Sequence, residues 1–213
     1  VDVNRETTIR NLFAAGDVAG GAPYKFVSGC WAEGVIAARE MGRRAEEVKP
    51  ADIPGNLIEA EMRRVYAPLF YRTKQLAQLR PPDFEHRLQK ILEEYAGGSS
   101  TFFEMNEERL VTARKQLARL PEQFPFIEAH DLHDLMLAHS VMDRVDVAQT
   151  LVEHLIARKE TRWPGYQTRL DYPERDDAKW SVFINSRKDP ATGKLEVFTR
   201  PYEQIVPGSR YEG

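Results

Sequence analysis

The sequence is poor in cysteine and in long apolar runs. Cys30 is its single cysteine, which excludes an intrachain disulfide and a cysteine-ligated cluster and favours a cytoplasmic setting. No stretch is apolar enough to span a bilayer, and no signal peptide is visible. Neither sign of charge is in excess. Because the formal net charge is only -3, the composition does not indicate nucleic acid or an anionic membrane surface as a partner.

The most informative stretch lies near the start of the chain. Leu12 to Ala15 is a short apolar run that stops at Gly16 and Asp17, as at the end of a buried parallel strand. A glycine-rich loop follows, and a helical pattern runs from about Ser28 to about Val48. An acid can accept hydroxyl hydrogen bonds, and a helix N-terminus offers N–H groups and partial positive charge, so this layout suits a nucleotide-type ligand. An ordinary strand–loop–helix connection has the same pattern.

The middle of the chain is predicted to be helical. Two prolines and a glycine between Lys49 and Gly55 predict a linker, so we place a domain boundary there. Apolar residues at helical spacing predict four further helices, over about 56–79, 84–95, 107–120 and 131–159. Asp83 and Asn106 are the expected N-caps of the second and third, and the fourth allows a break at 140–146. These stripes indicate helix–helix core rather than a cofactor site.

The C-terminal part has a different composition. Residues 160–180 are loop-like and rich in arginine, aspartate and aromatic residues. Two β-rich runs, at 180–185 and 194–199, then flank a loop that carries Asp189 and Gly193, which predicts a hairpin. The expected fold is therefore mainly α, with a β-hairpin near the end.

Four segments carry a family resemblance. Asn11 to Asp17 resembles the GLFAAGD/E strand of the fumarate reductase and succinate dehydrogenase flavoprotein superfamily. Tyr24 to Gly34 is similar to the HKFSSGSxAEG signature of adenylylsulfate reductase alpha subunits. Residues 160–180 resemble the superfamily's ESRGxHxRxDYPxxD segment, and the stretch from Asn185 to Tyr202 resembles the C-terminal extension of the adenylylsulfate reductase alpha subunits.

The resemblance implies a fold and a parent protein. Residues 1–48 would be the C-terminal end of a FAD-binding α/β domain, residues 49–160 a helical bundle domain, and residues 161–213 an extension with the hairpin. No G-x-G-x-x-G fingerprint precedes the strand, and a FAD domain of this superfamily needs one for the pyrophosphate. The resemblance therefore implies the C-terminal part of a longer flavoprotein, which needs its N-terminal remainder to hold FAD.

The resemblance also implies which residues meet the cofactor. They are Gly16, Asp17, Ser28, Gly29, Cys30 and Trp31. Asp17 would bind the ribityl chain of FAD, and the backbone around Gly29 to Trp31 would face the pyrimidine end of the flavin. A helix N-terminus at this place would stabilise negative charge on the reduced ring.

Lys25 and Tyr24 are the implied catalytic residues. Lys25 stands where succinate and fumarate enzymes carry a substrate-binding arginine, and it would hold an anionic substrate as a point charge. Tyr24 departs from the family, whose pattern has histidine before the lysine. A phenol titrates near pH ~10, so Tyr24 is a poor proton shuttle at neutral pH.

The function implied by the resemblance is reduction of adenylylsulfate to sulfite and AMP, or the reverse, with electrons from an iron–sulfur beta subunit. Two alternatives stay open. Tyr24 favours another fumarate reductase or succinate dehydrogenase type of flavoprotein with a dicarboxylate substrate, and the isolated chain could be a non-catalytic helical interaction module. No metal is expected, because His130, His133 and Glu128 lack a further ligand at a firm spacing. Arg162 and Arg169 are predicted to form structural ion pairs.

Overall fold

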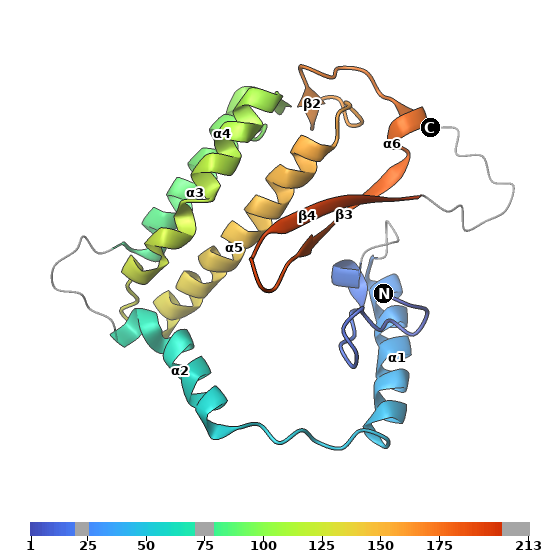
Figure 1. Cartoon of the computed structure of the whole chain (residues 1–213), viewed down its shortest axis with the longest axis vertical. Coiled ribbons are helices and arrows are strands. Elements are labelled where there is room, and N and C mark those ends of the chain that lie inside the picture. Colours follow the sequence, from blue (N-terminus) through green and yellow to red (C-terminus); the bar gives the residue numbers. More distant parts are fainter. Residues whose placement is uncertain (20–25, 71–78, 202–213) are drawn as a thin grey trace, which may run out of the picture. The chain divides into compact units, whose positions relative to one another are not determined.

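The computed structural model describes residues 1–19, 26–70 and 79–201, and these residues are mainly helical (Figure 1). The chain divides into two compact units, Val1–Ile58 and Glu59–Gly213, which are taken separately below. Among the described helices, none has both the length and the apolar character needed to cross a membrane. Tyr24 and Lys25 lie outside the described residues.

The first unit consists of an irregular N-terminal segment, the short 3-10 helix η1 (Gly16–Ala19) and the long helix α1 (Phe26–Ala45). The prediction of a buried strand at Leu12 to Ala15 is wrong, because no strand covers these residues in the described structure. Phe13 forms only an isolated antiparallel bridge with Glu6, and Leu12 is half exposed. A parallel strand is stable only beside a neighbouring strand, and the described part of this unit pairs none with it.

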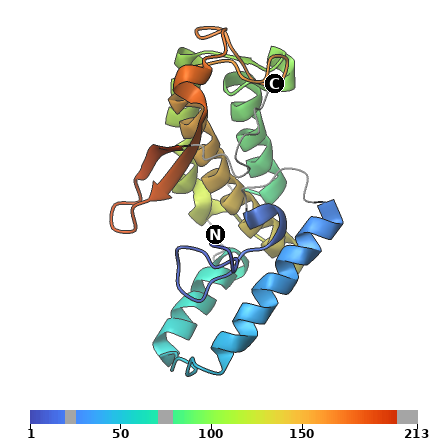
Figure 2. The ribbon, with the colours of Figure 1, turned by 90° about the vertical axis from the view of Figure 1, so that its right-hand side faces the viewer.

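The second unit is built on three helices that lie lengthwise against each other (Figures 1 and 2). They are α3 (Pro81–Tyr95), α4 (Glu107–Leu117) and α5 (Leu132–Ala157). Their facing stripes form one buried core, to which Phe84, Leu88, Ile91, Ala113, Leu117, Ala138, Val141, Val145, Ala148 and Val152 belong. The predicted stripes are thus helix–helix core. Helix α2 (Gly55–Phe70), which spans the division between the units, differs from expectation because Leu57 and Met62 are exposed.

The helix ends follow capping chemistry. Asn106 caps α4 as predicted, since its side chain accepts the Arg109 N–H at 2.9 Å. The expected cap at Asp83 is wrong. Helix α3 begins three residues earlier with Pro81, because proline lacks an N–H and is favoured in the first turn, where an N–H has no intrahelical acceptor. No break interrupts α5, which runs continuously over the 140–146 region.

Short connections complete the second unit. The 3-10 helices η2 (Ser99–Thr101) and η3 (Leu120–Phe126) follow α3 and α4. A two-residue parallel pair joins β1 (Glu104–Met105) to β2 (Thr168–Arg169). The charged run 174–177 is predicted to be a solvated loop, and its four residues are exposed, with 174–176 outside any helix or strand. Its last residue begins the short helix α6 (Asp177–Trp180).

The predicted hairpin is present. Strand β3 (Val182–Lys188) pairs antiparallel with β4 (Leu195–Pro201), and Gly193 takes the positive φ of +68° that closes the loop. At the loop, the Asp189 carboxylate accepts the Thr192 N–H at 2.7 Å. Lys188 binds Asp146 of α5 at 3.1 Å, so the hairpin is attached to the long helix.

Arg169 ties the end of α5 to the C-terminal segment. Its guanidinium is almost fully buried and donates to the carbonyl oxygens of Leu155 and Arg158 at 2.5 and 3.0 Å. It also pairs with Glu107 at 2.9 Å and with Asp171 at 3.0 Å. The interpretation of Arg169 as a structural ion-pair residue is confirmed by these contacts.

Glu160 is the centre of a second buried cluster. Its fully buried carboxylate accepts hydrogen bonds from Arg158, from Arg162 and from the Asp176 N–H. Burial alone would raise the pKa of Glu160, but the hydrogen bonds from Arg162, Asp176 and Arg158 outweigh it. The pKa therefore lies below its usual value of 4.5. Arg162 also pairs with Asp177 at 2.8 Å, as expected of a structural residue.

We expect this depressed pKa to make the second unit less stable in acid. The carboxylate of Glu160 contributes its full stabilisation above pH 4.5 and loses it as the pH falls through the lower folded-state pKa. Glu160→Gln should lower the free energy of unfolding by about 2 kcal/mol at neutral pH. The difference from the wild type should shrink below pH 4.5. Urea denaturation between pH 3 and 7 measures it, with exposed Glu59→Gln as the control. A pH-independent difference would contradict the assignment.

Candidate functional site

One face of α1 holds the N-terminal segment in the first unit. Cys30, Glu33 and Arg44 share this face at helical spacing and contact residues between 5 and 17, and Ala37 of the same face is buried. Cys30 and Glu33 meet the Gly16–Asp17 turn, and Arg44 meets the segment further down the helix. This stripe therefore places the end of the apolar run against the first half of α1.

The Gly16–Asp17 turn has a backbone shape that needs glycine. Gly16 is buried with φ at +77°, in the left-handed region that side chains disfavour. A Cβ added to Gly16 would stand 3.3 Å from the Cys30 Sγ, so the helix and the turn approach closely. The Gly16 N–H donates to Glu33 Oε2 at 2.8 Å, and Arg5 donates to Glu33 Oε1 at 3.0 Å.

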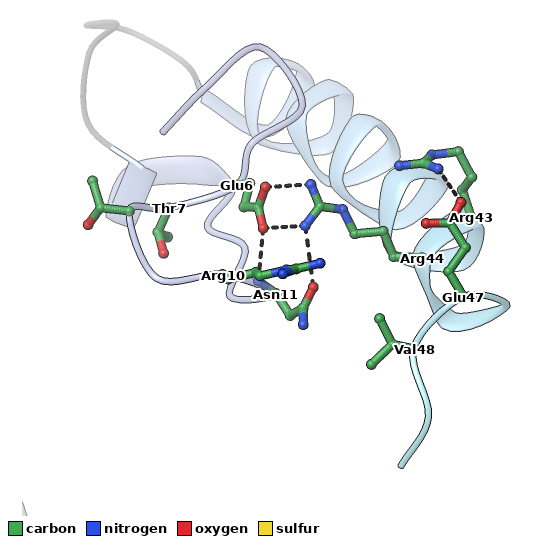
Figure 3. Close-up of a pocket in the computed structure, with 9 residues that line it drawn as sticks. Glu6, Thr7, Arg10, Asn11, Arg43, Arg44, Glu47 and Val48 are labelled. Carbon is green, nitrogen blue, oxygen red and sulfur yellow. Dashed lines mark hydrogen bonds and ion pairs between the residues drawn. The ribbon is translucent and has the colours of Figure 1, made fainter. Parts of the chain in front are cut away.

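Arg44 lies at the C-terminal end of this stripe and binds Glu6 and Asn11 of the N-terminal segment (Figure 3). Its guanidinium forms a two-point ion pair with Glu6 and donates to Asn11 Oδ1 at 3.3 Å. The Asn11 N–H and Arg44 together hold the pKa of Glu6 below its usual value. The hollow beside this pair has a volume of about 490 Å³. Since Arg43 and Arg44 already bind Glu6, Glu40 and Glu47, we assign this hollow a structural role.

A larger and more apolar hollow lies at the other end of the stripe. Its volume is about 1020 Å³, and its wall is formed by Asp17, Phe26, Val27, Cys30, Trp31, Gly34, Val35 and Ala38. Trp31 leaves 75% of its surface exposed there. The Cys30 thiol donates to Asp17 Oδ1 at 3.8 Å, while Asp17 itself remains exposed. A hollow with apolar walls and one carboxylate at its rim suits a flat apolar ring that carries hydroxyl groups.

The first turn of α1 reaches the same hollow. The helix begins at Phe26, two residues before the expected start, so Ser28 lies in the first turn and its N–H has no acceptor within the helix. Gly29 is half buried beside it, and neither of these two residues is in the wall of the hollow. Cys30 and Trp31, which follow directly and begin the second turn, do line it.

The structure thus places Asp17, Cys30 and Trp31 around one hollow, with Gly16 as the backbone turn behind it. Glu33 is the residue that the sequence interpretation missed. The available signal was an acid three residues after Cys30 on the same helix face, but its partners, Gly16 and Arg5, are set only by the folded chain.

The histidines show no metal centre. Within the described ranges, no group of three or more His, Cys, Asp or Glu side chains is arranged to hold a metal ion. His130 instead meets Asp134, with 3.0 Å between Nδ1 and Oδ2, and His139 meets the Val65 carbonyl oxygen at 2.7 Å. The hydrogen bond from His130 lowers the pKa of Asp134.

The helical second unit is of the class found at the C-terminal end of flavoproteins. Residues 85–209 match the family model described as "Fumarate reductase flavoprotein C-term", and the chain belongs to this family. Within it, the chain is 31% identical over 96% of its length to the adenylylsulfate reductase subunit alpha of Megalodesulfovibrio gigas. It is 28% identical over 84% of its length to the fumarate reductase flavoprotein subunit of Haemophilus influenzae.

Solved structures give the same relationship. Adenylylsulfate reductase from the hyperthermophilic Archaeoglobus fulgidus superimposes on 97% of this chain with a TM-score of 0.89 and 40% identity. An E. coli quinol fumarate reductase, FrdA, superimposes with a TM-score of 0.72 at 21% identity, which supports the fold alone. The chain covers 32% and 34% of the two adenylylsulfate reductase chains, so it spans about a third of their length.

Proposed function

We propose that this chain is the C-terminal part of a FAD-dependent oxidoreductase that converts adenylylsulfate to sulfite and AMP, or runs the reverse. The observation that carries the proposal is the placement of Asp17, the Gly16 turn and the start of α1 around one apolar hollow. The sequence comparisons support the proposal, because this chain is 31% and 40% identical to two adenylylsulfate reductases over nearly the whole of its own length. One solved relative is described as a complex with sulfite as a covalent adduct.

FAD fits the residues present. Asp17 is exposed at the rim of the hollow and can accept hydrogen bonds from ribityl hydroxyl groups. The hollow has a volume of about 1020 Å³, and Trp31 and Cys30 in its wall would border the flavin ring. Bound FAD supplies the redox chemistry. The chain's own residues orient it, and the first turn of α1, with Ser28 and Gly29, favours negative charge nearby.

The proposal extends to domains and partners. Residues 1–48 form the end of the FAD-binding domain, residues 49–160 the helical bundle, and residues 161–213 the extension with the hairpin. The N-terminal remainder of the same flavoprotein supplies the pyrophosphate site, and an iron–sulfur beta subunit supplies electrons. The setting we propose is cytoplasmic, which the single cysteine of this chain supports.

We expect the flavin to depend on both the remainder of the protein and Asp17. The purified 213-residue chain should show almost no flavin absorbance, because it carries no pyrophosphate fingerprint. In the full-length protein, Asp17→Ala should lower flavin content and weaken FAD binding about tenfold or more, since a charged hydrogen-bond acceptor is lost. A control is Asp52→Ala in the linker, which should keep its flavin. A stoichiometric yellow protein from the isolated chain would refute the divided site.

A second candidate is a fumarate reductase or succinate dehydrogenase type of enzyme. Tyr24, in place of the histidine of the adenylylsulfate reductase pattern, favours it, and the Haemophilus influenzae relative belongs to that type by name. The third candidate, a helical interaction module without chemistry, applies only to the isolated chain. Assays of the full-length protein with adenylylsulfate and with fumarate separate the two enzyme candidates.

A further inference from the structure

We infer that Glu33 is a positioning residue of the flavin site, which sets Asp17 against the first turn of α1. The inference rests on the proposed function, because it gives Asp17 its role at FAD. Glu33 lies outside the wall of the hollow and is argued to act through the Gly16–Asp17 turn.

The two carboxylate oxygens of Glu33 hold two separate points of the N-terminal segment. Oε2 accepts the Gly16 N–H at 2.8 Å, one residue before Asp17. Oε1 accepts Arg5 Nη1 at 3.0 Å, and the Glu33 side chain is only 13% exposed. Arg5 is in turn joined to the same segment, because its carbonyl oxygen accepts the Ala14 N–H at 3.0 Å. Glu33 therefore attaches both ends of the segment between Arg5 and Gly16, which leads into Asp17, to helix α1.

These two contacts of Glu33 determine the position of Asp17 relative to α1. In the described part of the first unit, the apolar run is bonded to residues 5–7 of the same segment, and the side chains of Glu33 and Arg44 attach that segment to α1. The turn at Gly16 adopts a positive φ, and a hydrogen bond to a carboxylate is stronger than one to a neutral acceptor. Without Glu33, the turn can move relative to α1, and Asp17 loses its fixed distance to the helix start.

A matched control exists on the same helix. Glu40 has a side chain that is 14% exposed and binds two arginines, Arg43 and Arg44. It therefore resembles Glu33 in burial and in ion pairing, but it lies near the other end of α1 and touches neither Gly16 nor Asp17 in the contacts described. Glu40→Ala measures how much a lost ion pair on α1 matters in general.

The test uses the full-length protein and measures the FAD dissociation constant of the apoprotein by flavin fluorescence. Glu33→Ala should weaken FAD binding about tenfold, while Glu40→Ala should leave it within about twofold even where both lower the melting temperature. Glu33→Gln should restore much of the affinity, because the amide oxygen can still accept the Gly16 N–H. If Glu33→Ala fails to fold, Glu33→Met is the measured variant, because it keeps the length of the side chain, removes both acceptor oxygens and should weaken FAD binding to the same extent.

A double substitution separates positioning from direct binding. If Glu33 acts through Asp17, Glu33→Ala added to Asp17→Ala should weaken FAD binding no further than Asp17→Ala alone. Additive losses, or equal losses for Glu33→Ala and Glu40→Ala, would overturn the inference while leaving the flavin site intact. If Asp17→Ala itself leaves FAD affinity unchanged, the proposed flavin site fails and the role of Glu33 falls with it.

Discussion

Arg169→Met is expected to lower the free energy of unfolding of the second unit by about 3 kcal/mol, toward the range for breaking a buried ion pair. The Arg169 side chain is 3% exposed and donates to two carbonyl oxygens, Leu155 and Arg158, as well as to Glu107 and Asp171. Methionine keeps the apolar stem but removes the donor to the carbonyl oxygens of Leu155 and Arg158 and the partner charge of Glu107 and Asp171. Burial opposes the lowered pKa of Asp171, and the hydrogen bond from Arg169 is the main contribution that lowers it.

The comparison variant is Arg187→Met in the hairpin. Arg187 pairs with Glu196 at 2.7 Å, but both side chains are mostly exposed. An exposed pair of this kind contributes about 0–1 kcal/mol, so this variant should unfold almost like the wild type. Urea denaturation followed by circular dichroism measures both. Equal midpoints for the two variants would show that Arg169 does not anchor the end of α5.

Lys25→Met in the full-length enzyme is expected to lower kcat/KM for the true substrate by about one to two orders of magnitude. The sequence resemblance implies that Lys25 supplies the charge that holds an anionic substrate, and we propose this role for it. Loss of one charged hydrogen-bonding partner costs roughly 1.5–3 kcal/mol. Methionine keeps much of the stem and removes the charge. Flavin content should not change, because the residue is assigned to the substrate rather than to FAD.

Steady-state assays with adenylylsulfate and with fumarate, run in parallel, test this result. Lys49→Met in the linker is the matched control, since it removes an exposed lysine from the same unit and should keep full activity. An unchanged kcat/KM in Lys25→Met would make Lys25 a surface lysine. Turnover of fumarate without turnover of adenylylsulfate would show that the protein shares the superfamily but not the adenylylsulfate reductase activity. The replacement of the family histidine by Tyr24 would then be the sequence difference that accounts for it.

The helices were predictable because their signals are local. The stripe of Phe84, Leu88 and Ile91 has helical spacing, and Asn106 carries the capping chemistry in its own side chain. The hairpin also has a local signal, since Asp189 and Gly193 stand at a turn between two β-rich runs. The error at Asp83 is local too, because a proline pair before it starts the helix earlier.

The strand at Leu12 to Ala15 failed for a different reason. A strand is decided by its neighbours, and a short apolar run carries no information on whether a neighbouring strand is available. In the described part of the first unit, the run is bonded to the segment before it, since the Thr7 N–H donates to the Leu12 carbonyl oxygen at 2.8 Å and the Ala14 N–H donates to that of Arg5 at 3.0 Å. The α1 side chains Glu33 and Arg44 bind the residues on either side of the run, Gly16 and Asn11.

The sequence by itself determined the helical character of the second unit, its core stripes, the hairpin and the family to which the motifs belong. These depend on spacing, turn chemistry and short motifs, all of which are readable along the chain. Only the tertiary structure decided that Glu33 reaches Gly16 and Arg5, and that Arg169 is buried against Leu155 and Asp171. The physical reason is that a charged side chain finds its partner through the folding of distant segments, and helical spacing alone does not specify that partner.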